Sequence, residues 1–347
     1  MCGFRFHPLL YRCRTGMVIS MFFNLTISGV LFHLDLDEDV YQHFLTRVPA
    51  NSSKDLSFPN VTIFCKRVNQ LHLTNTKFLS QQEPDISELS LYREIFGVGT
   101  FKYNRINKHM DCYYVINNQY PYNAYEVVVD TILQFIYLIM LDYNVTPLHV
   151  SVVSYHRKAI LIFGNSGSGK STLELALLSS GFDFFSDDVA FYDMNGRIYS
   201  SGESIIAFNL STNQLINSTF KERSIIPQSF ITIRKSPLEK HIITMIPANQ
   251  HYLVPHLLLF PVHSNDMVET LEQIPANNAL TRLIKLSISS GFSSSQKQQY
   301  LYQLRKLVDS TSAFQYSWTS NSTSNLLCIC NRIKKNMMLS EICCYDK

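Results

Sequence analysis

The chain has 347 residues, of which 46% are apolar and 16% are charged, and its formal net charge is +3. This length indicates two domains, or one large domain with an appended region, and the apolar content suffices for a substantial core. The charge is too small to predict a nucleic-acid partner, and the basic residues Arg332, Lys334 and Lys335 are typical of a solvated strand end.

Cysteine spacing argues against a zinc site and against a disulfide framework. There is no C-x-x-C pair and no histidine at zinc spacing among the eight cysteines, which are Cys2, Cys13, Cys65, Cys112, Cys328, Cys330, Cys343 and Cys344. The alternation around Cys328 and Cys330 favours a strand. We therefore expect reduced thiols in a cytoplasmic protein.

The first 120 residues predict an α+β region. Strand-like patterns cover residues 22–35, 61–67 and 113–118, and a helical pattern covers residues 38–47. Residues 17–32 are apolar but too short to span a membrane and contain Asn24, Thr26 and Ser28, so a pair of strands is the better interpretation.

Residues 125–143 form a long apolar segment that invites a membrane interpretation. Asp130 lies near its middle, where a charge would be costly in lipid. We expect instead a buried helix packed under a strand that begins at His149, and no membrane partner.

Residues 164–171 fill the phosphate-loop pattern G-x-x-x-x-G-K-[ST] at every fixed position: Gly164-Asn165-Ser166-Gly167-Ser168-Gly169-Lys170-Ser171. An apolar strand-like run at 158–163 precedes this loop, and a helical run from Thr172 to residue 180 follows it. This order aims backbone N–H groups and a helix N-terminus at a phosphate. Residues 164–172 are thus the candidate nucleotide-binding set. Lys170 would contact the outer phosphates and Ser171 would ligate Mg²⁺.

Two adjacent carboxylates, Asp187 and Asp188, follow the next short apolar strand. An aspartate at such a strand end can hold Mg²⁺, and a neighbouring one can take the proton from an attacking hydroxyl. A solvated turn is the alternative. His149, in an apolar run upstream of the loop, is by composition either a core residue or a catalytic one.

Together, His149, the loop and the Asp187-Asp188 pair resemble the catalytic domain of HPr kinase/phosphorylase and its bacterial relatives, with the same spacings and no gaps. The resemblance implies an ATP- and Mg²⁺-dependent serine kinase with the phosphoenolpyruvate-carboxykinase-like α/β P-loop fold and a mixed sheet. It implies three catalytic residues: His149, which helps orient the transferred phosphate, Lys170, and Asp188, which acts as the base. It also implies that Ser171 and Asp187 bind the metal.

One segment of the family is missing here. True HPr kinase/phosphorylases carry a Leu-Glu-Ile-Arg-Gly-Leu-Gly segment after the aspartate pair, and this chain has none; Glu203 is a weak substitute. The resemblance therefore implies a divergent kinase branch acting on a serine of a protein or peptide. It leaves open phosphorylase activity, the acceptor's identity and homo-oligomer formation. Two alternatives remain, a nucleotide-binding regulator or ATPase without an acceptor and a small-molecule kinase.

The predicted organisation has three parts. Residues 1–120 form the N-terminal α+β region, residues 121–320 the nucleotide-binding catalytic domain, and residues 321–347 a C-terminal strand and tail. Further helices are expected at 279–286 and 298–307.

Overall fold

The computed structural model is a mixed α/β protein with several sheets. It describes residues 20–48, 60–68, 85–86, 90–95, 99–115, 124–202, 205–219, 231–235, 238–245, 250–263, 270–286, 292, 294–318 and 323–342. The chain divides into two compact units: residues 1–144 with 289–298, and residues 145–288 with 299–347.

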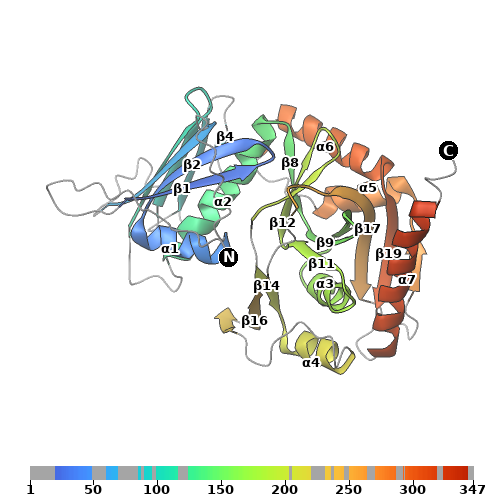
Figure 1. The fold of residues 1–347 in the computed structure, drawn as a ribbon. Helices are drawn as coiled ribbons and strands as arrows, with labels where there is room; N and C mark the ends of the chain where they lie inside the picture. Colours follow the sequence, from blue (N-terminus) through green and yellow to red (C-terminus); the bar gives the residue numbers. More distant parts are fainter. Residues whose placement is uncertain are drawn as a thin grey trace, which may run out of the picture. The chain divides into compact units, whose positions relative to one another are not determined.

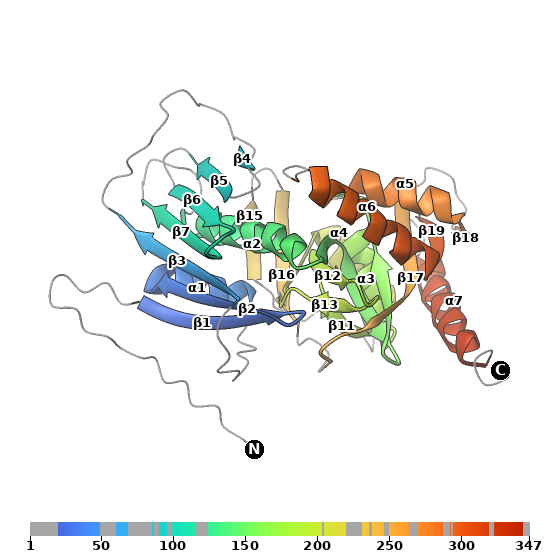
Figure 2. The ribbon, with the colours of Figure 1, turned by 90° about the horizontal axis from the view of Figure 1, so that it is seen from above.

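The first unit contains a seven-stranded mixed sheet in the order β1-β2-β3-β7-β6-β5-β4 (Figure 2). Its strands are β1 (Ser20–Ile27), β2 (Val30–Asp37), β3 (Val61–Arg67), β4 (Asp85–Ile86), β5 (Ser90–Ile95), β6 (Gly99–Asn104) and β7 (His109–Tyr114). Strands β2, β3 and β7 run parallel, and the remaining pairs are antiparallel. The predicted strand pair is confirmed as the β1–β2 hairpin, and the predicted strand at 61–67 is β3.

Two helices, α1 (Glu38–Arg47) and α2 (Ala124–Asp142), belong to this unit. Helix α1 has the predicted bounds, because the Asp37 side chain accepts a hydrogen bond from the Val40 N–H and caps its first turn. Alternate residues of the sheet are fully buried, among them Leu34, Ile63 and Phe101. The core of the unit thus lies on one face of the sheet.

Helix α2 corrects the predicted domain boundary near residue 120. It packs against α1, and its Phe135 ring lies 6.2 Å from that of Phe101 on β6, so it groups with the first unit. By length and composition it is long and apolar enough to cross a membrane, as the core helix of a soluble protein can also be. Twelve of its residues are buried within the described structure.

The second unit is built on a six-stranded mixed sheet in the order β11-β9-β10-β17-β19-β18. Its members are β9 (Ser151–Tyr155), β10 (Lys158–Ile162), β11 (Asp183–Ser186), β17 (Val254–His263), β18 (Thr270–Gln273) and β19 (Ser312–Trp318). Strands β10, β17 and β19 are parallel, so their carboxyl ends share one edge of the sheet.

Helices cover both faces of this sheet (Figure 1). Helix α3 (Lys170–Ser179) packs on the face that carries Leu259, in a core shared with α4 (Leu210–Thr219) and α7 (Thr323–Ile342). Helix α5 (Ala276–Leu286) lies on the opposite face, where Arg282 stacks over Phe260. Helices α5 and α6 (Ser294–Asp309) confirm the two helices predicted in this region.

Two three-stranded sheets complete the unit. One has the order β13-β12-β8, from β8 (Val145–His149), β12 (Val189–Asp193) and β13 (Ile198–Ser200). The other has the order β14-β16-β15, from β14 (Ile205–Phe208), β15 (Ile231–Lys235) and β16 (Leu238–Thr244).

Two local predictions were wrong. His149 ends strand β8 instead of beginning a strand, because the chain leaves one sheet there and enters another at Ser151. The predicted C-terminal strand is helix α7, since Leu326, Ile329, Cys330, Ile333 and Met337 are buried at helical spacing. The predicted strand at 113–118 overlaps the end of β7, and residues 116–118 lie outside the described residues.

Candidate active site

The phosphate-loop sequence lies between β10 and α3, at the edge where the parallel strands end. The loop turns at residues 165–168, where the Ser168 N–H donates to the Asn165 carbonyl (3.1 Å). Gly167 has φ +82° and Gly169 has φ +97°, values that residues with a side chain rarely adopt. These two glycines allow the chain to fold tightly back into the helix.

The start of α3 presents unpaired backbone donors. Its N-cap is Gly169, which provides no side chain to cap the helix. Within the described part of the chain, no backbone acceptor faces the N–H groups of Gly169, Lys170 or Ser171. Such orphan N–H groups, together with the helix dipole, favour an anion at this position.

The loop is packed tightly against itself and against β19. A Cβ atom on Gly164 would lie 2.2 Å from the Ser168 Oγ, and one on Gly169 would lie 2.5 Å from the Trp318 Nε1. The Trp318 Nε1 donates to the Ser168 carbonyl oxygen at 2.7 Å. Space and backbone angle therefore both require glycine at position 169, whereas Gly164 lies in close contact with the Ser168 side chain.

The two predicted carboxylates form a strained turn between β11 and β12. The Val189 N–H donates to the Asp187 carbonyl (2.8 Å), and Asp188 between them has φ +65°. Non-glycine residues in the left-handed region are uncommon, and such strain is often found at functional sites. The Asp188 side chain is 58% exposed and that of Asp187 is 11% exposed, so the two carboxylates have different environments.

His149 reaches this turn because β8 pairs with β12. His149 is the register partner of Val189, and the Val150 N–H donates to the Asp188 carbonyl (3.0 Å). The His149 Nδ1 lies 3.2 Å from the Asp188 Oδ1. Burial, then the nearby Lys170 ammonium, lowers the pKa of His149, and Asp188 opposes this only in part. This shift favours the neutral imidazole.

Lys170 connects the loop to the carboxylates. Its Nζ lies 3.7 Å from the Asp188 Oδ1 and 4.0 Å from the Asp187 Oδ1, and its side chain is largely buried. Four groups predicted from the sequence, which are His149, Lys170, Asp187 and Asp188, therefore converge beside the loop. These distances leave the ammonium free of a tight ion pair and able to contact a further anion.

Two residues beside Asp187 extend this cluster. The Ser151 Oγ donates to the Asp187 Oδ1 at 2.5 Å. Glu174, one turn into α3, is fully buried next to Ser151 and Asp187. Burial, and then Asp187, raises the pKa of Glu174 well above its ordinary value. Glu174 is a buried acid that the sequence-based site did not include.

The oxygen donors present fit Mg²⁺ bound together with a nucleotide. Ser171 supplies a hydroxyl at the helix start and Asp187 a carboxylate, whereas the described residues contain no group of three His, Cys, Asp or Glu side chains suited to a metal ion. Mg²⁺ is usually held by one or two carboxylates plus phosphate oxygens, not by an all-protein cage. Glu203 lies outside the described residues.

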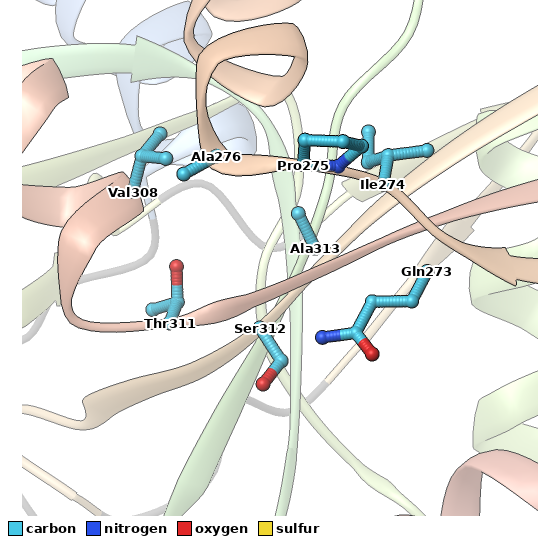
Figure 3. A pocket seen from close by; sticks show the side chains of 8 residues that line it. All are labelled: Gln273, Ile274, Pro275, Ala276, Val308, Thr311, Ser312 and Ala313. Atoms are coloured by element: carbon cyan, nitrogen blue, oxygen red, sulfur yellow. The ribbon is translucent and has the colours of Figure 1, made fainter.

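A cavity of about 390 Å³ lies elsewhere, at the other edge of the sheet (Figure 3). It is lined by Gln273, Ile274, Pro275, Ala276, Val308, Thr311, Ser312 and Ala313. Ser312 begins β19, whereas the phosphate loop follows the end of the parallel strand β10. This cavity is therefore separate from the candidate active site.

Comparisons with known proteins find distant structural neighbours. No family model matches the chain, and no curated protein matches it. Chains of solved structures do match, among them the Hpr(Ser) kinase/phosphatase from Coxiella burnetii. That structure is 13% identical, has a TM-score of 0.26, and the match covers 56% of this chain and 98% of the neighbour. At this TM-score the similarity carries no argument about function.

Every residue of the predicted nucleotide-binding set lies in the loop or in the first turn of α3. Asn165 and Ser166 are exposed at the loop tip, and the Thr172 Oγ1 lies 3.1 Å from the Thr212 Oγ1 of α4. Sequence reasoning missed Ser151, Glu174 and Trp318. The lone charge of Glu174 within the apolar run of α3 was a usable signal, whereas Ser151 and Trp318 lack a motif.

Proposed function

We propose that this protein is an ATP-dependent kinase that transfers the terminal phosphoryl group of ATP to a serine hydroxyl of a protein or peptide. The catalytic unit would be of the phosphoenolpyruvate-carboxykinase-like type found in HPr kinases. The supporting observation is the convergence of His149, Lys170, Asp187 and Asp188 beside a loop with free N–H groups.

In this proposal the loop N–H groups and Lys170 bind the phosphate chain. Ser171 and Asp187 would hold Mg²⁺, which neutralises charge on the phosphates. Lys170 lies near both carboxylates and would stabilise the transferred group as its charge shifts. Positioning and electrostatic stabilisation are the main demands of phosphoryl transfer, because the enzyme supplies little covalent chemistry.

Asp188 is the better candidate for the base. Its side chain is 58% exposed and so can meet an acceptor, whereas Asp187 is 11% exposed and accepts a hydrogen bond from Ser151. Asp188 would take the hydroxyl proton while the serine oxygen bonds to phosphorus and the bond to the ADP oxygen breaks. His149, neutral and 3.2 Å from Asp188, would hold this carboxylate and assist at the transferred group.

The test is the Asp188→Asn variant, assayed with γ-labelled ATP and with serine-containing peptides from reading frames that neighbour the gene of this protein. A general base contributes about 10²–10⁴-fold, so transfer should fall at least about a hundredfold while nucleotide binding remains. Asp183→Asn is the matched control, because Asp183 is an exposed aspartate at the start of β11. Its rate should be unchanged.

Three outcomes would contradict the proposal. Unchanged turnover in Asp188→Asn removes Asp188 from the base role. Hydrolysis of ATP without any labelled peptide favours an ATPase or a nucleotide-binding regulator. Label that appears only in a small molecule favours a small-molecule kinase.

A further inference from the structure

Trp318 contacts the phosphate loop from a distant part of the chain. It ends β19, which runs parallel to β17, and β17 runs parallel to β10, so Trp318 lies at the edge where the loop begins. Its indole N–H donates to the Ser168 carbonyl oxygen at 2.7 Å. Trp318 lies outside the loop motif, so the motif assigns it no role in nucleotide binding.

This hydrogen bond fixes the direction of one peptide group. In a trans peptide the C=O of one residue and the N–H of the next point to opposite sides. Since the indole holds the Ser168 carbonyl on its own side, the Gly169 N–H must point away from Trp318. That N–H is the first of the unpaired donors at the start of α3.

The indole itself has little freedom to move. It lies against Gly169, where an added Cβ would come within 2.5 Å of Nε1 and 2.6 Å of Cε2. The His263 ring also meets the indole edge-on, with ring centroids 4.9 Å apart and planes at 89°. Trp318 also packs against the apolar core that contains α3. The donor is thus held in place before any ligand arrives.

We propose that Trp318 is a positioning residue of the phosphate loop, which orients the Ser168–Gly169 peptide so that the Gly169 N–H points at the phosphate chain. Trp318 thus contributes to the binding of the phosphates and not to the binding of the adenine base. This inference rests on the proposed nucleotide binding and adds a residue to that site.

The test measures affinity for Mg²⁺-ATP by calorimetry and for inorganic tripolyphosphate by competition with a fluorescent ATP analogue. Trp318→Phe keeps an aromatic ring and removes the N–H donor. Because the chain has a single tryptophan, replacing tryptophan by benzothienylalanine during expression changes this position alone and preserves the ring shape. The second replacement covers the case in which Trp318→Phe fails to fold.

Both replacements should weaken the binding of Mg²⁺-ATP and of tripolyphosphate by the same factor, about tenfold. The reason is that the hydrogen bond from the Gly169 N–H to a charged phosphate is misdirected. The matched control is Gln315→Leu, on the same strand as Trp318, which removes the hydrogen bonds of Gln315 with Arg282 of α5 and with Ser317. Its affinities should equal those of the unmodified protein.

Three results would overturn the inference. Unchanged affinities would mean that the indole only packs. Tighter binding would mean that it holds the loop in a non-binding shape. Loss of ATP affinity with unchanged tripolyphosphate affinity would mean that Trp318 contacts the adenine base of the nucleotide instead. If the unmodified protein binds neither ligand, the proposed function itself fails, which is a different result.

Discussion

The substitution Gly169→Ala should disable the loop by adding a single methyl group. Gly169 has φ +97°, and a Cβ there would lie 2.5 Å, 2.6 Å and 2.9 Å from three atoms of the Trp318 indole. The indole is rigid and packed, so it cannot give way like the end of a flexible side chain. Either the ring or the loop must move.

The cost has two parts. A side chain in the left-handed region costs about 1–2 kcal/mol. Displacing the indole breaks its hydrogen bond to the Ser168 carbonyl, which is worth about 1 kcal/mol. If binding requires the loop as described, a total of about 2–3 kcal/mol lowers nucleotide affinity by about 30- to 150-fold.

Calorimetric titration with Mg²⁺ and a non-hydrolysable ATP analogue measures this change, and thermal denaturation checks that the variant is folded. Gly196→Ala is the control, since Gly196 has φ +79° but its nearest neighbour, the Tyr192 Oη, is at an ordinary 3.8 Å. The Gly196→Ala variant should have the same backbone strain but bind the nucleotide with unchanged affinity. A Gly169→Ala protein that binds nucleotide like the unmodified chain would refute the reasoning.

Three further predictions concern charge. Lys170→Ala should weaken nucleotide binding at least about tenfold by calorimetry, because a charge-assisted contact is lost, whereas Lys334→Ala, near the far end of α3, should not. His149→Gln should reduce the loss of thermal stability between pH 7 and pH 5. The lowered pKa of His149 means that the unfolded chain binds its proton more tightly, so stability falls as pH falls through this range. Glu174→Gln should raise the unfolding temperature at pH 8 and leave it unchanged at pH 4. The raised pKa of Glu174 makes the folded state bind the proton more tightly, so stability falls as pH rises above the ordinary glutamate pKa. An equal rise of the unfolding temperature at pH 8 and at pH 4 would contradict the prediction for Glu174→Gln.

Local signals in the sequence were sufficient where a short segment determines its own structure. The helical pattern at residues 38–47 predicted α1 with its bounds. The glycine pattern between an apolar run and a helical run predicted the loop between β10 and α3. The same signals gave the candidate residues His149, Lys170, Asp187 and Asp188, which the fold brings together.

Tertiary contacts decided what the sequence could not predict. The partner of Gly169 is Trp318, which is far along the chain and reaches the loop only through parallel pairing of β10, β17 and β19. Cys328 and Cys330 alternate as a strand would, yet the wider spacing of Leu326, Ile329 and Ile333 buries a helical face. Short patterns mislead when a longer period sets the packing.

We propose above all that the loop holds a triphosphate whose terminal phosphoryl group faces Lys170 and Asp188. A crystal structure of the protein with Mg²⁺ and a non-hydrolysable ATP analogue tests this most directly. We predict phosphate density against the Gly169, Lys170 and Ser171 N–H groups, with the terminal phosphorus between the Lys170 ammonium and the Asp188 carboxylate. Density at another surface, or a terminal phosphate turned away from Asp188, would contradict the claim.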